Sequence, residues 1–412
     1  MSKCRFCNNE LELSFVDLGM SPLSNSYIPP EKLQKMEPFY PLHAFLCDKC
    51  FLVQLSEFES PENIFSEYAY FSSYSQSWLE HAKDYADSMT ERFGFNVSSN
   101  IVEIASNDGY LLQYFNNKNI PVLGIEPAEN VAKVAIDAGI PTLTKFFGTS
   151  TANELASQGR HADLLLGNNV LAHVPDLNDF VAGLKILLKD TGVITLEFPH
   201  LQRLMEQTQF DTIYHEHFSY FSCITVAKVL SSHGLTLFDL DELETHGGSL
   251  RVYAKHESDT SKQVSENVSK LIERETAIGF TDVNYYLEFS NRVKSIKRDI
   301  LDFLIQAKRD DKNIVGYGAA AKGNTLLNYC GIRTDFIDYV VDRSPHKQNQ
   351  FLPGTHIPVR SPDRIRETKP DYILILPWNI KDEVIEQMSD VREWGCKFVT
   401  FIPTVNIENE IY

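Results

Sequence analysis

The feature that most constrains this chain is an alternation of apolar strands and amphipathic helices that begins at residue 101. Strands are predicted over 101–105, 122–126, 162–167 and 192–198, and helices over 110–116, 129–138 and 177–188. Such alternation is typical of a parallel sheet with right-handed crossovers. The sequence therefore predicts a doubly wound α/β domain. Strands over 235–240 and 250–254 are expected to add an antiparallel pair at its edge.

A second α/β unit is predicted in the C-terminal part of the chain. Its strands are expected over 313–317, 337–341, 372–376 and 398–402. The polar stretch 256–282 before it is expected to form a linker or a solvated helix. An apolar stripe with helical spacing then follows, formed by Val293, Ile296, Ile300 and Phe303. That stripe predicts a long helix.

Composition limits the partners of this chain. Its 412 residues include 38 lysines and arginines against 56 aspartates and glutamates, a net charge of −18. This balance argues against sequence-independent nucleic-acid binding, which requires cations against phosphate. No apolar stretch approaches the ~18 residues that span a bilayer, and the N-terminus lacks the apolar core of a signal peptide. We therefore expect a cytoplasmic protein without a nucleic-acid or membrane partner.

Two C-x-x-C pairs lie near the N-terminus and are formed by Cys4, Cys7, Cys47 and Cys50. Four thiolates of this kind can surround one Zn²⁺ ion tetrahedrally and leave no open position for a substrate. We therefore predict a structural zinc site. A disulfide or redox pair is the alternative.

Polar residues follow the first predicted strand of the central unit, at the edge where open α/β sheets bind ligands. The candidates are Glu103, Ala105, Ser106, Asn107, Asp108, Gly109 and Tyr110, and the next strand ends in Glu126 and Pro127. Gly109 permits a close backbone approach, and Glu126 suits a ribose diol. The turn departs from G-x-G-x-x-G, which disfavours a dinucleotide. It resembles the S-adenosylmethionine (SAM) site of class I methyltransferases, and a plain turn with a surface glutamate is the alternative.

Three further segments carry candidate residues for chemistry on a second ligand. The strand over 162–167 leads into Asn168, Asn169 and His173, and the resemblance to methyltransferases implies that this position faces the methyl donor and its acceptor. A loop histidine with a purely structural role is the alternative for His173. Segment 210–221 contains Tyr214, Glu216 and His217, and each of these residue types can move a proton near neutral pH. A metal site at His215 and His217 is the alternative. The stretch 67–78 interleaves serines with aromatic residues, which indicates a surface for a polar ligand or, alternatively, core packing.

A glycine-rich turn opens a helix in the C-terminal unit. It contains Gly318, Lys322 and Asn324, and the next strand ends at Asp342 and Arg343. Backbone N–H groups at a helix N-terminus can approach phosphate, and lysine or arginine can add charge. The local pattern therefore predicts a ligand with a pyrophosphate group, and NAD is one candidate.

The four-cysteine set and six further motifs together resemble the zinc-containing, SAM-dependent sugar C-methyltransferases. They are the two cysteine pairs, EYAYFSSYSQSW (67–78), EIASNDGY (103–110), GNNVLAHVPD (167–176), YHEHFSYFS (214–222), HGGSLRVY (246–253) and GYGAAAKGN (316–324), in that order. The resemblance implies a zinc-binding domain over 1–66, a class I methyltransferase Rossmann-like domain over 67–275 and a C-terminal Rossmann-like α/β domain over 276–412 that binds a nucleotide sugar.

The same resemblance implies the reaction and the roles of residues. Family substrates are dTDP-4-keto-deoxysugars that receive a methyl group on the carbon beside the ketone, expected to be C-3. His217 is then the candidate base, Tyr214 and Glu216 position it or stabilise an enolate, and His173 with Tyr68 or Tyr70 contacts the sugar. Gly318, Lys322, Asn324 and Arg343 are expected at the pyrophosphate. An NAD-dependent sugar-nucleotide oxidoreductase and a non-catalytic zinc-ribbon adaptor are the alternatives.

Overall fold

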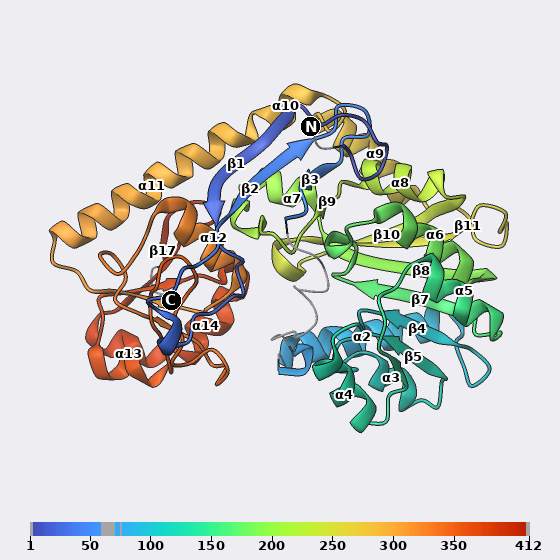
Figure 1. The fold of residues 1–412 in the computed structure, drawn as a ribbon, viewed down its shortest axis with the longest axis horizontal. Helices are drawn as coiled ribbons and strands as arrows, with labels where there is room; N and C mark the ends of the chain where they lie inside the picture. Colours follow the sequence, from blue (N-terminus) through green and yellow to red (C-terminus); the bar gives the residue numbers. More distant parts are fainter. Residues whose placement is uncertain (1–2, 59–70, 75, 409–412) are drawn as a thin grey trace.

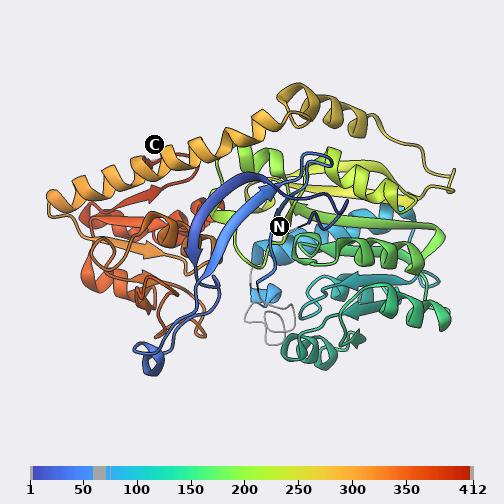
Figure 2. The same cartoon turned by 45° about the horizontal axis from the view of Figure 1, so that its top comes forward.

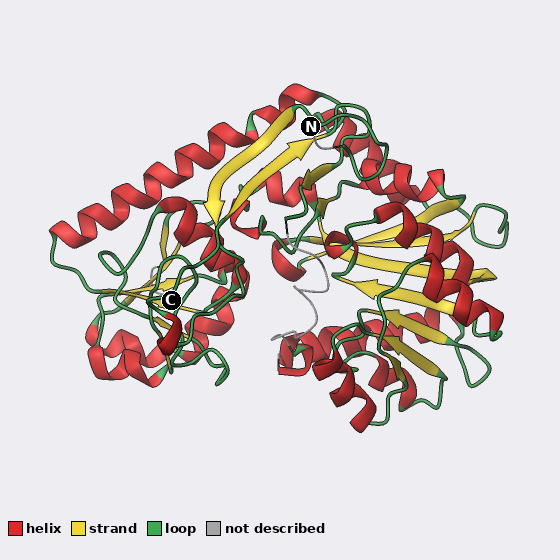
Figure 3. Cartoon of the chain, viewed as in Figure 1, coloured by secondary structure: helices red, strands yellow, loops and turns green. Residues whose placement is uncertain are grey.

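Three β-sheets organise the molecule in the computed structural model, which describes residues 3–58, 71–74 and 76–408 (Figure 1). The sheets contain seven, six and four strands. Helices cover the two larger sheets, and the smallest sheet lies between them (Figure 3). Tyr68 and Tyr70, which were predicted to contact the sugar, lie outside the described residues. No helix in the described ranges combines the length and the apolar character needed to cross a membrane.

The central sheet confirms the predicted doubly wound domain, with strand order β10-β11-β8-β7-β4-β5-β6. These strands are β4 (Ile101–Ile104), β5 (Val122–Ile125), β6 (Thr142–Leu143), β7 (Ala162–Asn168), β8 (Leu188–Pro199), β10 (Leu235–Leu243) and β11 (Ser249–His256). Neighbouring strands run parallel, except that β11 is antiparallel to both β8 and β10, as the closing pair was expected to be. This strand order is that of a class I methyltransferase.

Helices cover both faces of the central sheet because consecutive residues of its strands are apolar and point to opposite faces. One face packs against α2 (Gln76–Phe93), α3 (Leu112–Asn116) and α4 (Glu129–Asp137). The other face packs against α5 (Thr149–Ser157), α6 (Leu177–Leu187) and α8 (Cys223–Ser232). In β4, for example, Ile101 belongs to the first core and Val102 to the second. The carboxyl ends of β4, β5 and β7 therefore share one uncovered edge.

The C-terminal sheet has the order β14-β13-β12-β15-β16-β17 and is parallel except for β17. Its strands are β12 (Ile314–Tyr317), β13 (Val340–Val341), β14 (Val359–Arg360), β15 (Tyr372–Ile375), β16 (Lys397–Thr400) and β17 (Asn406–Glu408). The strand predicted over 337–341 is shorter than expected, because only two of its residues pair with a neighbour. Helix α12 (Ala321–Cys330) covers one face, and α13 (Asp363–Thr368) and α14 (Lys381–Gln387) cover the other.

The N-terminal sheet joins the two larger domains. It consists of β1 (Leu13–Ser21), β2 (Tyr40–Leu46), β3 (Val53–Leu55) and β9 (Ser219–Tyr220), so its last strand comes from the central part of the chain. One apolar core runs from this sheet through α11 (Phe289–Arg309) to the C-terminal sheet. Figure 2 shows β1 and β2 beside α11 between the two α/β domains.

The stretch between the two α/β domains corrects one expectation. Residues 256–282 contain α9 (Glu266–Ile278), whose Val268, Leu271 and Glu275 are buried. This helix packs against α8 and β10, so it is neither a linker nor a solvated helix. The predicted stripe of the following helix is confirmed in part, because Val293, Ile296 and Ile300 are buried in α11 whereas Phe303 is only partly buried.

Candidate active site between the two Rossmann-like domains

The four predicted metal ligands form one cluster, in which the sulfur atoms of Cys4, Cys7, Cys47 and Cys50 lie within 4.8 Å of one another. The sulfurs of Cys4 and Cys50 are 3.5 Å apart, as are those of Cys7 and Cys47. A disulfide bond is ~2.05 Å long, so the disulfide alternative is wrong. Four sulfurs at ~2.3 Å around a tetrahedral zinc ion are about 3.8 Å apart, so the donor set fits zinc in a closed, structural site.

The two C-x-x-C turns are built alike. In each, the residue after the second cysteine has a positive φ, 60° for Asn8 and 63° for Phe51. The backbone N–H of that residue donates to the carbonyl of the first cysteine at 2.9 Å. This conformation is unfavourable for a bulky residue such as Phe51, and it persists only where the surroundings require it. The paired turns direct all four sulfurs to one point.

The turn after β4 is organised by the carboxylate of Glu126, which follows β5. Glu126 accepts the backbone N–H groups of Asn107 and Ala128, each at 2.9 Å. Burial raises the pKa of Glu126, although both hydrogen bonds favour the anion. The structure brings the predicted donor-site residues together on this turn and the neighbouring one: Glu103, Ala105, Ser106, Asn107, Asp108, Gly109 and Tyr110, with Glu126 and Pro127.

The aromatic stretch before α2 reaches this same turn. The backbone N–H of Ser72 donates to Asn107 Oδ1 at 3.0 Å, and that of Ser73 donates to Asp108 Oδ2 at 3.1 Å. Trp78 stacks on Tyr110 with the ring centroids 6.1 Å apart. Ser72, Ser73 and Trp78 therefore contact side chains of the predicted donor site directly.

Glu103 on β4 is a buried acid for which neither carboxylate oxygen has a hydrogen-bond partner among the described residues. Burial, followed by repulsion from Asp108 and Glu126, raises the pKa of Glu103 well above its ordinary value. A buried carboxylate without a partner costs free energy, so it indicates where a ligand donor group belongs. SAM carries an ammonium group that can fill this need, and the site therefore fits the cofactor.

Asparagines end β7 at the same edge of the sheet. Both polar atoms of the Asn168 side chain are without partners among the described residues. Asn169 donates from Nδ2 to His246 Nε2 at 3.2 Å. Both Asn169 and His246 have a φ of 55°, in the left-handed region that non-glycine residues rarely adopt. His246 lies in η5 (Thr245–Gly247) and was not predicted as a site residue.

The segment that carries the predicted base is anchored on two sides. The backbone N–H of Phe218 donates to the carbonyl of Ala172 at 2.7 Å, in the loop that follows β7. Tyr220 in β9 pairs with Val53 of the zinc-binding domain. His215 Nε2 lies 3.2 Å from the carbonyl of Pro41, to which it donates, so His215 is an anchor. Among the described residues only the four cysteines form a metal-ligating cluster, so the structure does not support a metal at His215 and His217.

His217 is held in one tautomer. Its Nδ1 lies 3.0 Å from the carbonyl of Thr212, which can only accept, so Nδ1 carries the proton. Nε2 is then the unprotonated nitrogen, and it accepts the Tyr214 hydroxyl at 2.9 Å. Burial, and then the neighbouring His173, hold the pKa of His217 well below its ordinary value. His217 is therefore a neutral imidazole whose Nε2 can accept a proton.

The groups beside His217 are tuned by burial as well. The rings of His173 and His217 meet edge to face with centroids 4.7 Å apart. Burial lowers the pKa of His173 to about 4, so this ring is also neutral near pH 7. Glu216 accepts from Asn25 Nδ2 at 2.7 Å, and burial raises its pKa to about 7. Tyr214 and His173 thus both contact His217, and Glu216 lies on the same segment with its carboxylate bonded to Asn25.

The glycine-rich turn of the C-terminal domain is occupied by the protein itself. Asp342 Oδ2 accepts the backbone N–H of Ala319 at 2.8 Å. Lys347 Nζ and the Tyr27 hydroxyl donate to the carbonyl of Ala319 at 2.7 and 2.5 Å. Gly318 has a φ of 89°, and a Cβ there would lie 2.4 Å from Pro377 Cδ. A carboxylate therefore stands where a dinucleotide pyrophosphate would approach the turn.

The predicted pyrophosphate residues have different partners. Lys322 Nζ donates to Asn379 Oδ1 at 2.6 Å, whereas Arg343 is exposed and pairs with Glu383 at 3.4 Å. Asn324 is buried and donates to the carbonyl of Ser24 at 2.6 Å, which ties α12 to the N-terminal domain.

The sequence interpretation missed a buried ion network beside the donor site. Glu197 at the end of β8 accepts from His81 Nε2 (3.0 Å), Arg251 Nη2 (2.8 Å) and the Thr245 hydroxyl (3.3 Å). Burial alone would raise the pKa of Glu197, but its His81 and Arg251 partners hold it below the ordinary value. The HGGSLRVY motif contains Arg251 and was the one available signal.

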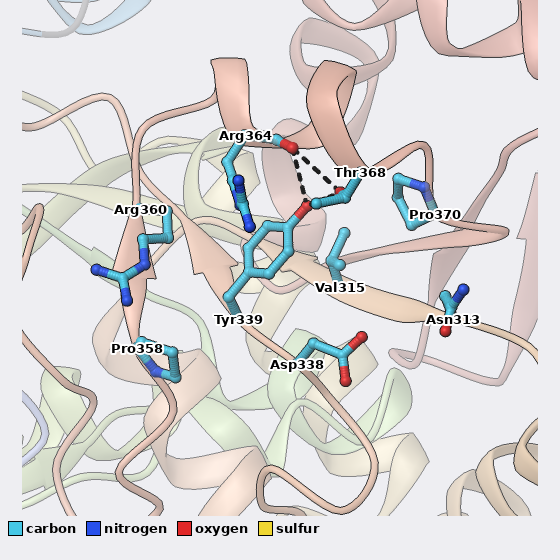
Figure 4. Close-up of a pocket in the computed structure, with 9 residues that line it drawn as sticks. All are labelled: Asn313, Val315, Asp338, Tyr339, Pro358, Arg360, Arg364, Thr368 and Pro370. Carbon is cyan, nitrogen blue, oxygen red and sulfur yellow. Dashed lines mark hydrogen bonds between the residues drawn. The ribbon is translucent and has the colours of Figure 1, made fainter.

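A cavity of about 390 Å³ lies elsewhere, at the amino ends of β12, β13 and β15 (Figure 4). Tyr339 crosses it and shares its hydroxyl with Thr368 and the carbonyl of Arg364. Ligands of parallel sheets bind at the carboxyl ends of the strands, so this cavity is on the opposite edge from the candidate site.

Three family profiles match successive parts of the chain. They describe a zinc binding domain (residues 4–65), a methyltransferase domain (78–240) and a C-methyltransferase C-terminal domain (244–403). Among solved structures, the PH0226 protein from Pyrococcus horikoshii OT3 aligns with 48% of this chain and 99% of its own, at a TM-score of 0.38 and 12% identity.

Similar proteins agree with these profiles. The ubiquinone biosynthesis O-methyltransferase of Bartonella tribocorum is 30% identical over 95 residues, which is 23% of this chain and 38% of that protein. The C-methyltransferase NovU of Streptomyces niveus is 33% identical over 403 residues, which is 98% of this chain and 96% of NovU. This similarity decides against the NAD-dependent oxidoreductase and the zinc-ribbon adaptor. The chain belongs to the zinc-containing, SAM-dependent C-methyltransferase family.

Proposed function

We propose that this C-methyltransferase acts on a nucleotide-linked 4-keto sugar and methylates the carbon beside the ketone, C-3 of a dTDP-4-keto-deoxysugar. The observation that carries the proposal is the neutral His217, whose Nε2 is available as a base in a site between the donor turn and the C-terminal domain. Carbon is a poor nucleophile until a neighbouring proton is removed, and a ketone makes that proton acidic. A buried neutral imidazole suits this task.

Each residue of the site has a separate role in the proposed reaction. His217 Nε2 takes the proton from the carbon, and the electrons of the broken C–H bond form an enolate with the ketone. Tyr214 donates to Nε2 in the resting site, so its hydroxyl turns toward the substrate when His217 acts. Glu216 and His173 fix the orientation of the sugar. SAM, when bound, supplies an electrophilic methyl group, and zinc keeps the anchoring sheet folded.

The nucleotide portion is proposed to bind along the C-terminal domain. Gly318, Asn324 and Arg343 are the candidate contacts, on the domain whose helix α12 packs against the segment that leads to His217. The net charge of −18 makes a local cation necessary for any diphosphate ligand. Dinucleotide enzymes place an acid such as Asp342 at the end of the second strand, where it binds the ribose 2′-hydroxyl group. Thymidine lacks that hydroxyl group, so the proposed substrate does not need Asp342 in this role.

Mass spectrometry of products from a panel of nucleotide-linked 4-keto deoxysugars tests the proposal. The purified protein, with zinc and SAM, should add one methyl group to the sugar of at least one member. The matching 4-hydroxy sugar is the control and should stay unmodified, because it has no carbonyl to stabilise an enolate. Protein that binds S-adenosylhomocysteine yet methylates no keto sugar would contradict the proposal.

A further inference from the structure

Lys322 is a partly buried cation with unused hydrogen-bonding capacity. It lies in the first turn of α12, donates to Asn379 Oδ1 at 2.6 Å, and places Nζ 4.7 Å from the ring centroid of Trp378. An ammonium group has three N–H donors, and the described residues accept one of them. Burial lowers the pKa of Lys322 to about 8.

The nearest acid does not neutralise Lys322 by direct pairing. Asp211 is fully buried, and its Oδ2 accepts from Trp378 Nε1 at 2.8 Å. Its Oδ1 has no hydrogen-bond partner among the described residues, and no ion pair within 4.0 Å joins it to Lys322 there. A buried carboxylate usually forms such a pair, because leaving it unpaired is costly. Lys322 therefore keeps N–H donors available for an anion.

Packing brings α12, the helix that carries Lys322, against the segment that leads to the base. The Thr325 hydroxyl, one turn further along α12, donates to the carbonyl of Ile213 at 3.2 Å. The preceding residue, Thr212, accepts from His217 Nδ1. Trp378, under Lys322, also touches Gly247, which follows His246. Burial is the main reason that the pKa values of His217 and His246 are lowered, and the charge of Lys322 adds to the lowering at both.

We infer that Lys322 stabilises the enolate oxygen of the acceptor, rather than the pyrophosphate that the sequence pattern indicated. This inference rests on the proposed function. As His217 removes the proton, the electron pair of the C–H bond becomes the C=C bond and the carbonyl π electrons move to oxygen. The Lys322 ammonium donates to that oxygen. When the carbon takes the methyl group from the sulfonium, the sulfur keeps the bonding pair and the carbonyl reforms.

The partners of Lys322 favour the enolate role. They are Asn379 and Trp378, and Trp378 donates to Asp211 in the segment that leads to His217. The turn that would cradle pyrophosphate instead offers Asp342, whose carboxylate already accepts the N–H of Ala319. A developing negative charge next to a preorganised cation in a buried site is where electrostatic stabilisation is largest.

Proton exchange without methyl transfer tests this inference. The full-length zinc protein is incubated in D₂O with S-adenosylhomocysteine and the keto sugar that the panel experiment identifies as a substrate. Loss of the proton on the carbon beside the ketone is followed by NMR. Lys322→Met should slow this exchange and kcat by about 10²–10³-fold, the usual cost of losing an oxyanion donor, with little change in KM. Lys322→Arg keeps the charge and should recover part of the exchange.

Several outcomes would overturn the inference. Lys322→Met with normal exchange contradicts it, and a raised KM with normal kcat assigns Lys322 to the diphosphate. Lys381→Met is the matched control, because Lys381 pairs with Glu408 in the same domain at 2.6 Å and should leave exchange unchanged. Calorimetric binding of S-adenosylhomocysteine shows whether each variant is folded. A wild-type protein inactive on every keto sugar overturns the proposed function, whereas an active wild type with an unaffected variant overturns only the role of Lys322.

Discussion

In both Rossmann-like sheets an acidic residue after the second strand accepts a backbone N–H from the turn after the first strand, but the two turns differ in how many polar groups remain free. In the central sheet, Glu126 after the second strand accepts an N–H from the turn after the first, that of Asn107 at 2.9 Å. In the C-terminal sheet, Asp342 does the same with the N–H of Ala319 at 2.8 Å. The central turn keeps Glu103 without a partner among the described residues, whereas Lys347 and Tyr27 fill the C-terminal turn.

This difference separates cofactor binding from acceptor chemistry. A turn that retains unsatisfied buried polar groups has a place for a ligand, whereas a turn whose groups are satisfied by its own chain offers a ligand fewer hydrogen-bonding groups. The C-terminal domain packs Trp378, with Lys322 over its ring, against Asp211 in the segment that leads to His217. The zinc-binding domain joins both sheets to this segment through β9.

Removal of zinc should have the largest effect on this arrangement. Structural zinc contributes about 10–16 kcal/mol in small zinc peptides, so chelation should unfold the cysteine turns and release β9 from β3. We expect turnover to be lost and to return with added zinc, while S-adenosylhomocysteine still binds the central sheet. Calorimetry and turnover on the same metal-free sample measure both. Full turnover without metal would show that β9 does not depend on the zinc domain.

Loss of the base should come next. His217→Asn should lower kcat by about 10²–10⁴-fold, the typical contribution of a general base, with the affinity for donor and acceptor preserved. His215→Gln is the matched control, because His215 donates to the carbonyl of Pro41. That control should lower the melting temperature and keep kcat close to wild type. Equal kcat losses in the two variants would remove His217 from its assigned role.

The two carboxylates should differ in their effect on the cofactor. Glu126→Ala removes an acceptor that organises the donor turn, and the affinity for S-adenosylhomocysteine should fall about 10–100-fold, as for a lost hydrogen bond to a charged group. Asp342→Ala should leave that affinity unchanged. Isothermal titration measures both, and NAD should bind neither variant nor the wild type. Similar losses at the two positions would erase the distinction between the turns.

A glycine at the interface of the domains should have a moderate effect on stability. Gly247 has a φ of 89°, and a Cβ there would lie 2.3 Å from Trp378 Cη2. We expect Gly247→Ala to destabilise the protein by about 1–3 kcal/mol through overpacking and backbone strain. Gly331→Ala is the control for strain alone, since its φ is 74° with nothing within 4 Å of the added Cβ. Denaturant unfolding should separate the two, and equal losses would argue against tight packing of Trp378.

The smallest expected effect is on the pH profile. His217 works as a base only when neutral, and it gains a proton only as the pH falls through its pKa, which burial holds well below 6.5. The acid limb of kcat/KM should therefore lie below pH 6.5. An acid limb above that value would mean that the free enzyme exposes His217 to water. The profile is read from initial rates at constant ionic strength.

Much of this architecture could be predicted from local sequence patterns. The apolar periodicity of strands and helices located both sheets, and the cysteine spacing identified the four ligands that converge within 4.8 Å. Alternation of period 2 or 3.6 reports which face of an element is buried, so it needs no knowledge of distant partners. The same logic failed for α9, whose polar composition hid three buried residues.

Only the tertiary structure decided how these parts share one site. Val53 pairs with Tyr220, and Asp211 bonds to Trp378, across separations that no local pattern encodes. The sequence predicted ligand sites at both turns, SAM at the first and a pyrophosphate at the glycine-rich second, yet Asp342 and Lys347 bind backbone groups of the second. The sequence was enough to identify the candidate residues. Which ones remain without partners, and so await a ligand, depends on contacts that exist only once all three sheets have packed.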